Sequence, residues 1–249
     1  MSKPTKKRSA PSQGGAPQAK KQKKSKFQVD ETLLNTELGV NESFSVMDNM
    51  LLADYLAQKL GRFGGDLSAV ELSDLSISAS AIADTTSWSK PRPAENLPEF
   101  LETFAEHPDR LGKAPSKKGS PHTIIVAGAG LRAADLVRVT RKFQTKDNQI
   151  AKLFAKHMKV EEQVKFLQST RTGIAVGTPA RLMDLVDNGA LSLSKLERIV
   201  VDASHIDQKK RGVMDMKDTM LPLAKWLTRP EFKARYDGSD EKPLQLLFF

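Results

Sequence analysis

The chain has 249 residues, of which 28% are charged and 39% hydrophobic, and it contains no cysteine. This length allows one mid-sized domain with extensions or two small domains. The lack of cysteine excludes disulfides, Cys-ligated zinc sites, iron–sulfur clusters and thiol catalysis. No run of about 18 apolar residues predicts a transmembrane helix, and no apolar segment follows the basic N-terminus as in a secretory signal. The histidines show no i,i+4 pair, so we expect no metal site.

The net charge of +9 is concentrated in residues 1–26, which contain nine lysines and arginines and no acid. Residues 1–45 lack apolar periodicity and are rich in Lys, Ser, Pro, Gln and Gly, which predicts a disordered basic tail. Two basic clusters fit a bipartite nuclear import signal, formed by Lys6, Lys7, Arg8, Lys20, Lys21, Lys23 and Lys24. A sequence-independent RNA-binding arm is compatible with the same charges, and simple solvated disorder is the alternative.

Residues 46–121 contain short helical patterns separated by polar stretches. The apolar face at 46–61 predicts a helix that stops near Gly61. Residues 62–95 have thinly spread apolar residues, which indicates an extended arm that docks a few anchors on a partner. A short helix is expected after Asn96, and a Pro/Gly/Lys linker at 108–121.

From residue 122 the pattern changes to alternating strands and helices. Apolar, mostly β-branched runs predict strands at 123–127, 173–177, 198–201 and 244–249, and helices are expected at 131–145, 179–188 and 213–228. The stretch 148–170 fits either a helix from Ile150 or a strand at 151–157 followed by a helix at 160–169, and the alternation favours the second. We therefore predict an α/β domain at 122–249 with a mostly parallel sheet covered on both faces.

The turn Gly128-Ala129-Gly130 follows one predicted strand and opens a helix, as in a G-x-G-x-x-A dinucleotide fingerprint. That fingerprint requires a second strand ending in an acid about 20 residues later, but residues 142–149 are polar. No G-x-x-x-x-G-K-[ST] phosphate loop occurs in the chain. We interpret the turn as a tight strand-to-helix connection, with a nucleotide- or dinucleotide-binding enzyme as the alternative.

The segment Thr178-Pro179-Ala180-Arg181-Leu182 is followed by a strand that ends in Asp202-Ala203-Ser204. This spacing resembles the first RecA-like domain of DEAD-box RNA helicases, in which T-P-G-R-L precedes D-E-A-D. The resemblance implies that Thr178, Arg181 and, from an earlier element, Arg132 contact RNA.

The same resemblance makes Asp202, Ala203 and Ser204 a degenerate second motif, since Ala203 replaces the catalytic glutamate. With no phosphate loop and no second RecA-like domain, it implies a pseudo-helicase without cofactor. An alternative role for Arg181 is to pair with Asp184 or Asp202 and stabilise the turn.

A broader resemblance covers residues 40–249. The segments 52–56, 67–75, 85–88, 97–101 and 152–163, followed by the T-P-x-R-L domain, occur in an order that resembles the eukaryotic family of small ribosomal subunit biogenesis factors. These are subunits of the U3-containing 90S pre-ribosomal complex.

The family resemblance implies a non-enzymatic assembly factor of the nucleus and nucleolus. Its expected partners are pre-ribosomal RNA and the proteins of the U3 snoRNP-containing 90S pre-ribosome, with no membrane and no small-molecule substrate. A general RNA-binding protein that acts through its tail remains a further alternative.

Overall fold

The computed structural model describes Met1 and residues 31–156, 158–236 and 243–249, so the predicted import signal lies outside the described residues. Its centre is a five-stranded sheet in the order β4-β5-β3-β6-β7, and every neighbouring pair is parallel. The strands are β3 (Thr123–Val126), β4 (Gln149–Leu153), β5 (Thr172–Gly177), β6 (Arg198–Val201) and β7 (Gln245–Phe248). The predicted α/β fold class with a parallel sheet is confirmed.

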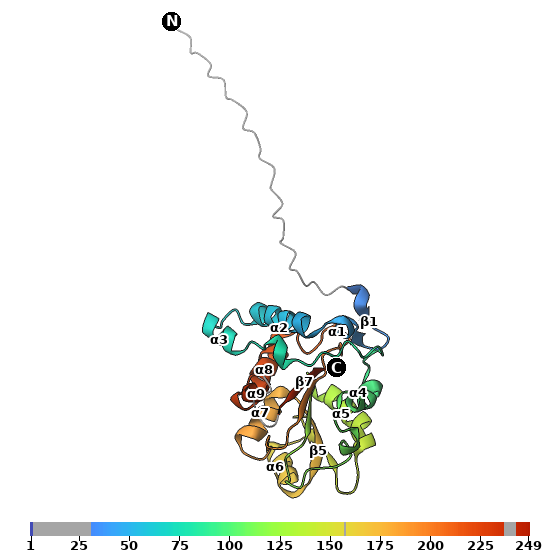
Figure 1. Cartoon of the computed structure of the whole chain (residues 1–249). Coiled ribbons are helices and arrows are strands. Elements are labelled where there is room, and N and C mark those ends of the chain that lie inside the picture. The colour runs from blue at the N-terminus through green and yellow to red at the C-terminus, as the bar shows by residue number, and fades with distance from the viewer. Residues whose placement is uncertain (2–30, 157, 237–242) are drawn as a thin grey trace.

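Helices cover both faces of the sheet (Figure 1), which is why β3, β5 and β6 are buried along their whole length. One face carries α2 (Asn49–Phe63), α6 (Val160–Ser169), α7 (Pro179–Asp187) and α8 (Lys217–Leu227), and the other carries α4 (Leu97–Phe104) and α5 (Gly130–Thr140). α9 (Pro230–Tyr236) follows α8. No helix among the described residues is long and apolar enough to cross a membrane.

Some predicted boundaries were wrong by a few residues. The helix expected at 160–169 has those ends, but the strand expected at 151–157 runs from Gln149 to Leu153. The helix expected at 131–145 ends at Thr140, where the chain tightens into the 3-10 turn η5 (Arg141–Phe143). The helix expected at 213–228 starts only at Lys217.

The prediction that disorder extends to residue 45 was wrong for residues 31–45. After the 3-10 turn η1 (Glu31–Leu33), β1 (Leu34–Asn35) pairs with β2 (Val40–Asn41), and α1 (Ser43–Val46) follows. The Asn41 N–H donates to the Ser204 carbonyl at 2.7 Å, and Val40 forms an isolated bridge with His205. Phe44 is buried edge-on against Tyr55. Main-chain pairing with the segment after β6 therefore orders a stretch that is poor in apolar residues.

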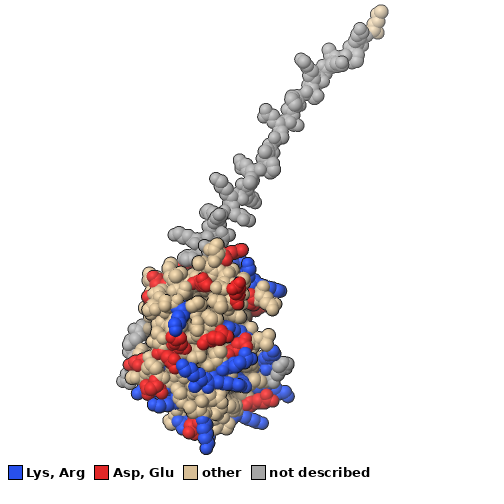
Figure 2. Space-filling model, turned by 90° about the vertical axis from the view of Figure 1, so that its right-hand side faces the viewer, with Lys and Arg blue, Asp and Glu red and all other residues tan. Residues whose placement is uncertain are grey.

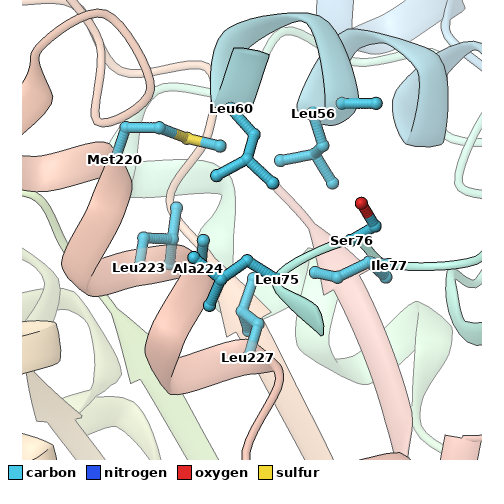
Figure 3. A pocket seen from close by; sticks show the side chains of 10 residues that line it. Leu56, Leu60, Leu75, Ser76, Ile77, Met220, Leu223, Ala224 and Leu227 are labelled. Atoms are coloured by element: carbon cyan, nitrogen blue, oxygen red, sulfur yellow. The ribbon is translucent and has the colours of Figure 1, made fainter. Parts of the chain in front are cut away.

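The arm at 46–121 packs on its own domain, and the expectation that its anchors reach a partner was wrong for those anchors. Leu60 of α2, with Leu75 and Ile77 of the arm, packs against Met220 and other apolar side chains of α8 (Figure 3). The cavity left between them measures only ≈ 10 Å³. In the sequence, the short helix α3 (Ala69–Asp74) lies between α2 and Leu75, and it begins with a capping box. α2 is thus part of the domain core.

The arm also covers one edge of the sheet. After η2 (Ala79–Ala81), Ile82 bridges to Leu246 of β7, and the Ala83 N–H donates to the Leu246 carbonyl at 2.9 Å. Further along, the buried Arg92 donates from Nη1 to the Phe248 carbonyl at 2.6 Å. The short turns η3 (Ala94–Asn96) and η4 (Pro108–Arg110) flank α4. The arm therefore contributes to the apolar packing on both faces of the sheet, and β4 forms the other edge.

Candidate functional site

The residues singled out by the helicase resemblance lie at the carboxyl ends of β3, β5 and β6. Arg132 lies in the first turn of α5, Thr178 is the N-cap of α7, Arg181 lies in the first turn of α7, and Asp202 follows β6 directly. In open α/β sheets, ligands bind outside the carboxyl ends of the strands, here called the carboxyl edge. The candidate residues lie together at the carboxyl edge, and their contacts decide which of them are available to a ligand.

Arg132 and Asp202 form a bidentate ion pair. The guanidinium donates from Nε to Oδ2 at 3.0 Å and from Nη2 to Oδ1 at 2.8 Å. The side chains are 11% and 2% exposed. Burial alone would lower the pKa of Arg132, but the Asp202 carboxylate outweighs it and the pKa is raised. Both carboxylate oxygens of Asp202 are thus engaged by the chain's own arginine.

The next residues of the degenerate motif face the interior. The N–H groups of Ala203 and Ser204 donate to the Phe249 carbonyl at 2.8 and 2.9 Å, and the Ala203 methyl group is buried in the core. The Ser204 hydroxyl is buried without a hydrogen-bond partner among the described residues. His205 is partly buried, which lowers its pKa, although the Asp202 charge opposes the shift. No carboxylate beyond Asp202 is supplied here.

Arg181 makes no ion pair with a described acid, so the alternative in which it pairs with Asp184 or Asp202 was wrong. Its Nη1 donates to Gln163 Oε1 at 2.6 Å and to the Met158 carbonyl at 3.1 Å. Gln163 in turn donates from Nε2 to the carbonyls of Lys152 and Phe154, at 2.8 and 3.0 Å. Arg181 therefore ties α7 to α6 and to the end of β4. No sequence motif marks Gln163, because its role depends on a contact between separate elements.

Thr178 caps α7 by position, with an extended backbone, but its side chain makes no capping hydrogen bond. Its N–H donates to the Leu153 carbonyl at 3.2 Å, which fixes the turn. Pro179 removes one of the donors that a helix N-terminus normally presents. The half-buried Thr178 hydroxyl therefore makes no capping hydrogen bond within the described part of the chain and is available at the carboxyl ends of the strands.

The glycine turn is packed by its own chain. A Cβ at Gly128 would lie 3.1 Å from the Val213 Cβ, and one at Gly130 would lie 3.3 Å from the Lys156 Cβ. The two glycines thus permit close approach of neighbouring segments, which supports the interpretation as a tight connection. Lys156 is exposed and makes no ion pair with a described residue, so it adds an uncompensated charge beside the turn. Neither Lys156 nor Val213 belongs to a motif that marks a site in the sequence.

Within residues 31–156, 158–236 and 243–249, no group of three or more His, Asp or Glu side chains is placed to hold a metal ion. The positively charged residues of the predicted import signal are outside these ranges. The geometry of the described edge is therefore that of a polar surface with one neutralised acid, one free hydroxyl and nearby basic side chains.

Known proteins similar to this chain show which family it belongs to. Protein CMS1 of Chaetomium thermophilum is 59% identical over 233 residues, which cover 94% of this chain and 92% of that protein. Protein cms1 of Schizosaccharomyces pombe is 30% identical over 198 residues, or 80% of this chain and 69% of that protein.

Among solved structures, the yeast DEAD-box splicing factor Prp28 is similar with a TM-score of 0.42 and 16% identity, over 65% of this chain and 40% of that one. The family model for CMS1, the U3-containing 90S pre-ribosomal complex subunit, matches residues 2–249, and the chain belongs to this family.

Proposed function

We propose that the chain is a non-enzymatic scaffold that holds pre-ribosomal RNA and protein partners in the 90S pre-ribosome during small-subunit maturation, in the nucleolus. The family description supports membership of the complex. The observation that carries the non-enzymatic role is the buried Arg132–Asp202 pair.

ATP hydrolysis needs a phosphate cradle, an acid that holds the metal ion and a positioned water. Asp202 is the acid in the corresponding position, and Arg132 occupies both of its oxygens. Ala203 supplies no carboxylate to orient a water. Asp202 and Ala203 are therefore better suited to stabilising the fold than to binding a metal ion.

At the carboxyl edge, fewer residues are available for RNA contact than the sequence suggested. Arg132 is neutralised by Asp202, so it contributes little to an RNA phosphate without breaking that pair. The Thr178 hydroxyl and the Lys156 ammonium remain available for RNA contact. The guanidinium of Arg181 can contribute the nitrogen atoms that do not bind Gln163. The basic tail adds sequence-independent affinity for RNA through counterion release.

The test is crosslinking of the tagged full-length chain to pre-ribosomal RNA. Thr178→Val combined with Lys156→Glu is expected to reduce crosslinking at the domain by at least about threefold, whereas Lys225→Glu on the exposed face of α8 serves as the matched control. Equal crosslinking of the double variant and the control would remove the RNA role of this edge. ATP turnover that RNA stimulates and Asp202→Asn abolishes would contradict the non-enzymatic assignment.

The tail is tested separately. Replacing Lys20, Lys21, Lys23 and Lys24 by alanine is expected to shift the protein toward the cytoplasm, because the second basic cluster loses its charge. Fluorescence microscopy measures the nuclear fraction. Unchanged nuclear accumulation in cells where the protein cannot enter with a partner would argue against the import signal.

A further inference from the structure

The two edge strands of the sheet, β7 and β4, differ in how far the rest of the chain covers them. The arm covers β7 with a main-chain hydrogen bond from Ala83 and a side-chain hydrogen bond from Arg92, whereas β4 pairs in the described sheet with β5 alone. The Leu153 carbonyl accepts from the Thr178 N–H, so Leu153 and Ala151 direct their main-chain groups toward β5. In a parallel ladder the alternate residues, here Ile150 and Lys152, direct theirs outward. An exposed edge of this kind is a template for another strand.

A groove of ≈ 300 Å³ runs along this edge, between the end of α5 on one face and α6 on the other. Its apolar lining includes Val137, Ile150 and Phe166. Gln163 closes one end, because its amide donates to the outward carbonyls of Lys152 and Phe154. The N–H and carbonyl of Ile150 and the N–H of Lys152 remain for an added strand.

Two of the three charged residues that line the groove are basic. The side of the molecule that carries α4 and α5 faces the viewer in Figure 2, where lysines and arginines gather among acidic residues. Arg138 and Lys142, the sequence neighbours of the groove residues Val137 and Arg141, are neutralised, since Arg138 pairs with Asp135 and Lys142 with Glu102.

Two basic residues that line the groove keep their charge. Arg141 and Lys152 have no ion-pair partner among the described residues. The groove also contains one acidic residue, Glu162, and one oxygen of its carboxylate accepts the N–H of Lys159 at the start of α6. The lining therefore has two basic residues against one acidic residue, and an occupant with negative charge complements this excess.

We propose that β4 is a docking edge for an extended acidic segment of a partner protein, which adds a sixth strand to the sheet. Main-chain hydrogen bonds to Ile150 and Lys152 supply the pairing, the apolar lining receives alternate side chains, and Arg141 and Lys152 select negative charge. The basic tail of this chain is a poor occupant because its charge has the same sign as the rim. The inference goes beyond the proposed RNA contacts, which lie at the carboxyl edge of the sheet.

The direct test uses the full-length chain and a nine-residue peptide of alternating valine and glutamate, with a valine–lysine peptide as its counterpart. The acidic peptide is expected to bind at least tenfold more tightly than the basic one. Lys152→Pro removes an outward N–H without breaking the ladder to β5, and proline is tolerated at such edge positions. This variant should lose at least another tenfold relative to Lys152→Ala, which has the same side-chain loss but keeps the N–H.

A second variant covers the case in which Lys152→Pro does not fold. Arg141→Glu with Lys152→Glu leaves the main chain intact and is expected to reverse the preference, so that the basic peptide binds more tightly. Equal binding of both peptides by the wild-type chain, or an unchanged preference in the charge-reversed variant, would overturn the proposal. Circular dichroism of each variant checks that the fold is retained.

The same edge is then tested in the assembled pre-ribosome. A photo-crosslinking residue at Gln144, on the rim of the groove, is expected to capture an acidic segment of a partner protein that mass spectrometry can sequence. Capture of RNA instead, or of a basic segment, would overturn the proposal. Thr178→Val with Lys156→Glu should leave this crosslink unchanged, so failure of the RNA assignment and failure of the docking edge give different results.

Discussion

The role of Arg132 can be decided by its effect on stability. Arg132→Met leaves the Asp202 carboxylate, which is 2% exposed, buried without its partner. Removing one member of a buried ion pair costs about 3–5 kcal/mol. Because Arg132 itself is 11% exposed and water has some access to the pair, we expect the lower end, about 3 kcal/mol. An arginine kept free for RNA would show no such cost.

The assay is urea unfolding of the full-length chain, with the loss of stability obtained from the midpoint and slope. Arg138→Met is the matched control, since its pair with Asp135 is 70% and 48% exposed and should contribute at most about 0.5 kcal/mol. Arg132→Met with Asp202→Leu removes both charges and should recover most of the loss. The reasoning is refuted if Arg132→Met costs no more than the control, or if the double variant loses the sum of the two single losses.

Three further predictions concern the fold. Burial lowers the pKa of His122 to about 4 from an ordinary 6.5, so its contribution to stability is complete above pH 6.5 and about 3 kcal/mol is lost as the pH falls to 4. His122→Gln should flatten urea midpoints across this range, and exposed His107→Gln should not. Gly61→Ala meets no atom and should stabilise α2 by about 0.5–1 kcal/mol, whereas Gly177→Ala, whose Cβ would lie 2.5 Å from a β4 carbonyl oxygen, should destabilise the chain. Leu60→Ala should cost about 2–5 kcal/mol by thermal unfolding if α2 belongs to the core.

The sheet was predictable because its strands are buried on both faces. Such strands are continuous apolar runs, and the runs at 123–127, 173–177, 198–201 and 244–249 each match a strand of the structure to within one residue at either end. The helix at 160–169 was predicted only because the alternation required it. Helix ends were less predictable, since the end of α5 at Thr140 depends on a local 3-10 turn.

The candidate site was predictable in its location but not in its pairing. Strand-end positions place Arg132, Arg181 and Asp202 at one edge, because parallel strands have their carboxyl ends together. Which arginine reaches the acid depends on the positions of α5 and α7 relative to β6, which are set by core packing. The sequence therefore offered Arg181 as a partner for Asp202, whereas the structure pairs Asp202 with Arg132.

The arm shows a stronger limit of sequence patterns, and it bears on how partners bind. Thinly spread apolar residues usually indicate a segment that orders on a partner, yet Ile82 and Trp88 are buried in this chain. A segment that pairs through its main chain needs only single anchors, so it leaves no periodic pattern. Since this pairing occupies the β7 edge, a partner that adds a strand to the described sheet has β4 available to it. A fragment that begins near residue 115 would expose β7 as well, and its binding would not represent the intact chain.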